Sequence, residues 1–120
     1  MWILIADGSR AALYFRPLAN GGLEPIDQWV YEPEPADGDR SREAARQDLQ
    51  KFASQLVGGL EEWEPRMERL LLVAPPRMLG EMRPLLNRNV RTKVEGELAK
   101  DLTREPLQNL PFRLDKLLRG

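Results

Sequence analysis

The sequence contains no cysteine and no histidine. Disulfides, thiolate nucleophiles and histidine general bases are therefore excluded, together with nearly every zinc or copper site. Long apolar runs are missing too, since no window approaches the ~18 apolar residues of a membrane span. The N-terminus has only a short apolar run that soon meets Asp7, with no basic segment before it, which is unlike a signal peptide. We therefore expect a cytoplasmic protein with no membrane insertion and no cofactor.

Charge is nearly balanced overall but uneven along the chain. The 120 residues suffice for one domain with its own core, and a net charge of −1 predicts no global attraction to nucleic acid. Residues 23–39 carry six acids and no base, whereas residues 77–93 carry five bases and one acid. Most such runs are solvated surfaces, although the basic one is also a candidate contact for phosphate groups.

The first half of the chain predicts three strands and a helix. Residues 2–6, 11–15 and 23–31 are rich in apolar, β-branched and aromatic residues and are separated by turn sequences, which favours an antiparallel meander. After a proline- and acid-rich loop, Asp39 or Ser41 is placed to cap a helix. That helix has one apolar stripe at helical spacing, formed by Ala45, Leu49, Phe52, Ala53, Leu56, Val57 and Leu60. Gly58-Gly59 should weaken its end.

The second half alternates strands with helices. Residues 69–74 are a continuous apolar run, which predicts a central strand covered on both faces. Pro76 suits the first position of a short helix, and Pro84 should break that helix. Its inward side is expected to hold Met78, Leu79, Met82, Leu85 and Leu86. Residues 90–98 alternate as in an edge strand, and a leucine-spaced tail interrupted by Pro111 follows. The order βββαβαβα predicts an α/β fold, a mixed sheet of about five strands flanked by helices.

Several motifs resemble the bacterial host attachment protein family. These are the opening A-D-x-S-R-A at residues 6–11, A-P-P-R-x-L-G at residues 74–80, and V-E-x-E-x-x-K-D-L-T at residues 94–103. The family takes its name from a proposed role in attachment to host cells. The resemblance implies a ribonuclease H-like fold, similar to the middle domain of the eukaryotic class-1 release factor. The chain has no GGQ sequence before its long helix, so peptidyl-tRNA hydrolysis is not implied.

The implied topology gathers polar residues at one edge of the sheet. In a ribonuclease H-like sheet the first, fourth and fifth strands are parallel, and ligand sites of such sheets lie at the carboxyl ends of the strands. Arg77 is disfavoured by the helix dipole in a first helical turn, so it should pair either with Asp7 or Asp101 or with an anionic ligand. The candidate ligand-binding residues are Asp7, Arg10, Arg77, Lys100, Asp101 and Thr103. Asp101 and Thr103 also suit a helix cap, and Asp7 suits a turn.

Three functions stay open at this point. The first is a non-enzymatic module that binds RNA or the ribosome through Arg83, Arg88, Arg91 and Lys93, should these share one face. The second is a protein–protein interaction module with an indirect role in attachment. The third is a metal-dependent phosphodiester hydrolase that would use Asp7 and Asp101. Two-metal catalysis needs several clustered carboxylates, and the sequence offers only these two at the expected edge. Ser9 has no histidine to serve as its base, so no catalytic residue is assigned. No metal ligand is assigned either.

Overall fold

The computed structural model describes residues 1–33 and 42–119, and its centre is a five-stranded mixed sheet. The strands are β1 (Trp2–Ala6), β2 (Arg10–Phe15), β3 (Glu24–Val30), β4 (Leu70–Val73) and β5 (Val94–Leu98), in the order β3-β2-β1-β4-β5. β1 is antiparallel to β2 and parallel to β4, and β4 is parallel to β5. The predicted α/β class is thus confirmed, and so is the parallel direction of the first, fourth and fifth strands. The ribonuclease H-like label itself stays a prediction.

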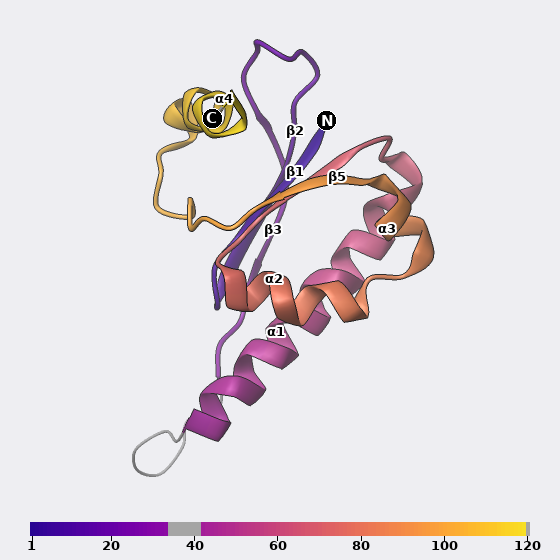
Figure 1. The fold of residues 1–120 in the computed structure, drawn as a ribbon, viewed down its shortest axis with the longest axis vertical. Coiled ribbons are helices and arrows are strands. Elements are labelled where there is room, and N and C mark those ends of the chain that lie inside the picture. Colours follow the sequence, from indigo (N-terminus) through magenta and orange to yellow (C-terminus); the bar gives the residue numbers. More distant parts are fainter. Residues whose placement is uncertain (34–41, 120) are drawn as a thin grey trace.

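Helices cover both faces of this sheet, as Figure 1 shows. One face carries α1 (Arg42–Trp63), α2 (Pro76–Met82) and α3 (Arg88–Lys93), and the other carries α4 (Leu110–Arg119). Single 3-10 turns lie at Glu64–Arg66, Arg83–Leu85 and Leu107–Asn109. Within residues 1–33 and 42–119, no helix is long and apolar enough to cross a membrane.

The two central strands explain why their sequences are continuously apolar. Side chains alternate between the faces of a strand, so a strand covered on both faces needs apolar residues throughout. Leu4 of β1 and Leu72 of β4 belong to the core beneath α1 to α3, whereas Ile5 and Val73 belong to the core beneath α4. Every residue of β1 and β4 is buried, and for β4 the sequence predicted this.

Helix α1 confirms most of the predicted stripe but not the predicted weak end. Phe52, Ala53, Leu56, Val57 and Leu60 are buried, while Ala45 is exposed. The helix continues through Gly58 and Gly59 to Trp63. A Cβ atom on Gly59 would lie 2.5 Å from the ring of Trp29, so this glycine lets α1 approach β3 closely. The predicted capping residues, Asp39 and Ser41, lie outside the described residues.

The segment after β4 follows the prediction closely. Pro76 begins α2, and Pro84 lies within the 3-10 turn that ends it, because a proline nitrogen has no hydrogen to donate to the helix. Met78, Leu79, Met82 and Leu86 are buried. Leu85 was expected to face inward, but it is 44% exposed because the 3-10 turn rotates it off the buried side.

The predicted strand over residues 90–98 is half wrong. Residues 88–93 form α3, and only Val94–Leu98 form β5. The Asn87 side chain accepts a hydrogen bond from the Val90 backbone at 2.8 Å, which caps the helix. Val90 is buried and Val94 packs against the same core, four residues apart. Alternating valines therefore satisfied a helical spacing as well as a strand spacing, and the cap decided between them.

The C-terminal helix begins later than the sequence predicted. Residues 99–106 form no helix, and α4 starts at Leu110 with Pro111 in its first turn. Leu110 and Leu114 are buried against the second face of the sheet. Arg16, which is 6% exposed, donates two hydrogen bonds to Asp115 at 2.7 and 3.1 Å, and so joins the end of β2 to α4.

Candidate functional site

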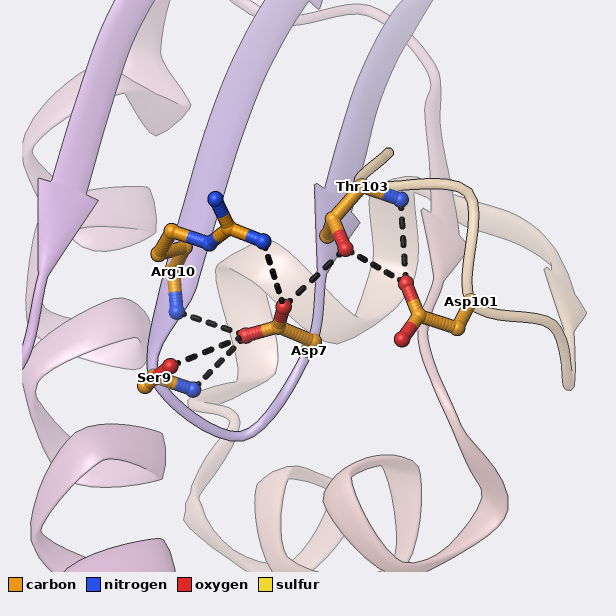
Figure 2. Close-up of polar contacts among 5 residues, drawn as sticks. All are labelled: Asp7, Ser9, Arg10, Asp101 and Thr103. Atoms are coloured by element: carbon orange, nitrogen blue, oxygen red, sulfur yellow. Dashed lines mark hydrogen bonds and ion pairs between the residues drawn. The ribbon is translucent and has the colours of Figure 1, made fainter. Parts of the chain in front are cut away.

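The turn between β1 and β2 holds Asp7 at the carboxyl end of the central strand. One oxygen of Asp7 accepts hydrogen bonds from the backbone nitrogens of Ser9 at 2.8 Å and Arg10 at 2.7 Å (Figure 2). The other oxygen lies 3.6 Å from the Arg10 guanidinium. Asp7 therefore builds the turn, as aspartate before glycine commonly does.

Thr103 links this turn to the segment that follows β5. Its hydroxyl lies 3.0 Å from Asp7 Oδ2 and 2.5 Å from Asp101 Oδ1, and its backbone nitrogen donates to Asp101 at 3.0 Å (Figure 2). Asp7, Arg10, Asp101 and Thr103 are thus brought together, as the topology predicted. One hydroxyl proton serves two carboxylates here. The predicted cap is wrong, however, because Asp101 and Thr103 form a local turn and no helix follows directly.

The environment lowers the pKa of Asp7. Partial burial acts to raise it, but the backbone hydrogen bonds of Ser9 and Arg10, the hydroxyl of Thr103 and the charge of Arg10 together outweigh burial. Asp7 is consequently ionised near neutral pH, and both of its oxygens are already engaged. A general acid would need the opposite shift.

Arg77 forms no ion pair with Asp7 or Asp101, so the internal salt bridge, one of its two predicted partnerships, is not formed. Its side chain is exposed and has no hydrogen bond or ion pair within the described part of the chain. Arg77 lines a hollow with Leu49 of α1, on the α1 side of the sheet. Thr103 instead borders a cavity with Leu102 and Leu110, on the α4 side.

Lys100 also emerges at this edge and is exposed, without a partner among the described residues. Residues 1–33 and 42–119 include no group of three or more acidic side chains placed to hold a metal ion. Two carboxylates remain, and Asp7 is already saturated with donors. Two-metal hydrolysis needs more ligands than this arrangement offers.

The four residues of the predicted basic face are in three different situations. Arg83 pairs with Glu97 at 2.6 Å, and Lys93 pairs with Glu64 at 3.2 Å. Arg91 donates to the backbone carbonyl of Leu86 at 3.1 Å and contacts that of Arg83 at 3.5 Å. Arg88 is exposed and has no partner in the described chain. Among these four residues, Arg88 and Arg91 are therefore the two that pair with no carboxylate of the described chain.

Two functional features escaped the sequence analysis. Arg16 and Asp115 are 99 residues apart, and no local spacing joins them. Arg46 lies on an exposed turn of α1 and lines the same hollow as Arg77. No pattern in the 30 residues between them predicts that the two arginines lie in the same hollow. A charged residue isolated at the end of an apolar strand, as Arg16 is, was the one available signal.

Fold and site together define a small α/β domain with a polar sheet edge, and comparison places it in a family. Residues 35–114 match the family model described as "Protein required for attachment to host cells". The chain belongs to this family, as the motifs indicated. No curated protein matches the chain. Among solved structures, one titled "Archaeal protein" is similar, with 12% identity and a TM-score of 0.44, over 98% of this chain and 38% of that one.

Proposed function

We propose that this host attachment family protein is a non-enzymatic module that binds RNA, free or within the ribosome, through α3. The resemblance that we expect between this family and the release-factor middle domain supports an RNA-containing partner. The proposed contact centres on Arg88 and Arg91, with Arg83 at its margin. A role in attachment to host cells would then be indirect, exerted on the synthesis of other proteins.

The observation that carries this proposal is the setting of Arg91. Two neutral backbone carbonyls hold its guanidinium in place, so the side chain is ordered while its positive charge stays uncompensated. Arg88 lies one turn away on α3 and is exposed. An ordered cation loses less conformational freedom on binding than a free one, which favours contact with a phosphate backbone.

Catalysis receives no such support. The chain has no histidine, and Asp7 is held ionised by its hydrogen bonds. Nothing in the described site pairs a nucleophile with a base. Binding is therefore the activity that the arrangement of charges favours.

Fluorescence anisotropy with a labelled single-stranded RNA of about 12 nucleotides tests the proposal. Affinity should fall as salt rises from roughly 50 to 200 mM. The double variant Arg88→Ala/Arg91→Ala should bind more weakly and with a shallower salt slope, by about 1.4, because each lost phosphate contact on a single strand removes about 0.7.

A matched control removes the same charge elsewhere. Lys51→Ala/Lys116→Ala changes two exposed lysines, on α1 and α4, and should retain the slope. Equal slopes in both double variants would show that α3 is not the contact. Absence of salt-dependent binding by the unaltered protein would refute RNA binding itself.

A further inference from the structure

A hollow of about 470 Å³ lies on the α1 side of the sheet edge, away from α3. It is formed where four segments meet, namely the β1–β2 turn, the residues that follow β3, the first turns of α1 and the start of α2. Ser9 comes from the turn, Arg46 and Asp48 come from α1, and Arg77 comes from α2. Residues of four separate segments thus line one concave surface, as is typical of small-ligand sites.

The charges that line this hollow are unbalanced. Arg46 and Arg77 are both exposed, and neither has a hydrogen bond or ion pair within residues 1–33 and 42–119. Asp48 is the acidic side chain among the described lining residues, and it is engaged elsewhere, accepting a hydrogen bond from the Tyr31 hydroxyl at 3.0 Å. Among the described residues, two arginines and one partnered aspartate therefore line the hollow.

Local structure does not account for these two arginines. Arg77 lies in the first turn of α2, where the helix dipole disfavours a positive charge, and Arg46 lies one turn into α1 without a partner among the described residues. The apolar side chains of Leu49 and Met78 form part of the same wall and lower the local dielectric, which strengthens the field of the arginines inside the hollow. An anion placed there would supply the charge partner that both arginines lack among the described residues.

We propose that this hollow binds a phosphomonoester group, with Arg46 and Arg77 as its charge partners. A guanidinium presents paired N–H donors that match phosphate oxygens, and two of them balance a dianion. A volume of about 470 Å³ exceeds that of a phosphate, so the molecule that bears the group is also partly accommodated. Such a group is found on small phosphorylated metabolites and at the 5′ end of RNA.

Thermal unfolding in sodium phosphate, compared with sodium chloride at equal ionic strength, tests the site. Phosphate should raise the melting temperature in a saturable way, because it binds the folded state alone. The increase should be lost in Arg46→Gln/Arg77→Gln and retained in Arg104→Gln, which removes an exposed arginine from the segment between β5 and α4. An equal increase in all three proteins would overturn the proposal.

NMR provides a readout that does not depend on the variants being stable. Titrating phosphate into the unaltered protein should shift the amide signals of Ser9, Arg46 and Arg77, and leave those of α3 unchanged. Shifts confined to α3 would place the anion at the RNA surface and overturn the proposal. Because Arg88→Ala/Arg91→Ala leaves this hollow intact, failure of RNA binding and failure of this site are distinguishable.

The same titrations separate the two sources of the group. A 5′-phosphorylated RNA that binds more tightly than its 5′-hydroxyl counterpart, by an amount that Arg46→Gln/Arg77→Gln abolishes, supports an RNA end as the ligand. Binding of glycerol 3-phosphate with no preference between the two RNAs supports a small metabolite. No response to either kind of phosphomonoester would refute the site.

Discussion

The two faces of the sheet are held by different means. Beneath α1, α2 and α3 lies the larger core, in which nineteen buried residues of the described chain form one cluster with four aromatic side chains at its margin. Beneath α4 the buried cluster has eight residues, and the helix is fixed in addition by the Arg16–Asp115 pair. The first face also has directional contacts, such as the Trp63–Asp27 hydrogen bond at 2.9 Å, but its apolar core is more than twice the size of the second. On the second face, a directional ionic contact supplements a small apolar area.

This difference shows how a short helix is retained on a small core. Burial contributes roughly 25 cal/mol per Å² and has no preferred direction, so a ten-residue helix with two buried leucines gains little and can slide. A bidentate arginine–carboxylate contact adds geometry that burial lacks. The sheet edge around Thr103 depends on this docking, because the segment that carries Asp101 and Thr103 is anchored through the 3-10 turn at Leu107–Asn109 to α4.

Equivalent truncations on the two faces should give the largest effects and differ between the faces. Leu56→Ala should cost about 4 kcal/mol, because its cavity lies between a 22-residue helix and the sheet and cannot collapse. Leu114→Ala should cost nearer 2–3 kcal/mol, because α4 is free to settle into the space. Urea unfolding measures both, and a larger loss at Leu114 would reverse the proposed difference between the faces.

Gly59 tests how tightly the first face is packed. A methyl group there would lie 2.5 Å from the Trp29 ring, so Gly59→Ala should destabilise the protein by roughly 1–3 kcal/mol. Gly58→Ala is the matched control, since nothing lies within 4 Å of its Cβ position. That change should stabilise α1 by about 0.5–1 kcal/mol. Thermal unfolding of both variants checks the contrast, which equal behaviour would contradict.

The ionic contact on the second face should give the smallest effect and the one that depends on pH. Asp115→Asn should cost about 1–2 kcal/mol at pH 7, less than the roughly 3–5 of a fully buried pair, because Asp115 is 30% exposed. Hydrogen bonds from Arg16 lower the pKa of Asp115, and its partial burial opposes this more weakly. The difference in stability should therefore persist above about pH 4 and vanish as the pH falls through the lowered pKa.

Urea unfolding at intervals from pH 7 to pH 3 measures this difference. Asp7 also has a lowered pKa and contributes to acid sensitivity in both proteins, so the difference between the curves isolates Asp115. Parallel curves across the whole range would show that the pair contributes nothing to holding α4.

The sequence predicted the parts of the fold whose signals are local. Continuous burial of β4, the stripe of α1 and the break at Pro84 follow from periodicity and backbone chemistry, which act over a few residues. Residues 90–93 fit a strand and a helix equally well, because Val90 and Val94 match both the strand period and the helix period. The Asn87 cap is the local signal that favours a helix there. Short apolar runs near a boundary carry this ambiguity by nature.

The candidate site was predictable only as far as topology reaches. Parallel strand ends brought Asp7, Asp101 and Thr103 together as expected. Topology gives the edge but not the face, so it could not show that Arg77 lies on the α1 side, with Arg46 rather than Asp7. Likewise, Arg16 and Asp115 are related by nothing in the chain between them.

The distance along the chain between Arg16 and Asp115 also bears on the order of folding. The β1–β2–β3 meander joins neighbouring segments, whereas the Arg16–Asp115 contact closes a loop of 99 residues. The entropy of closing a loop grows with its length, and distant contacts form after local ones. We therefore expect α4 to dock last during folding and to detach first in native-state hydrogen exchange, which would make the edge around Thr103 the earliest part of the domain to open.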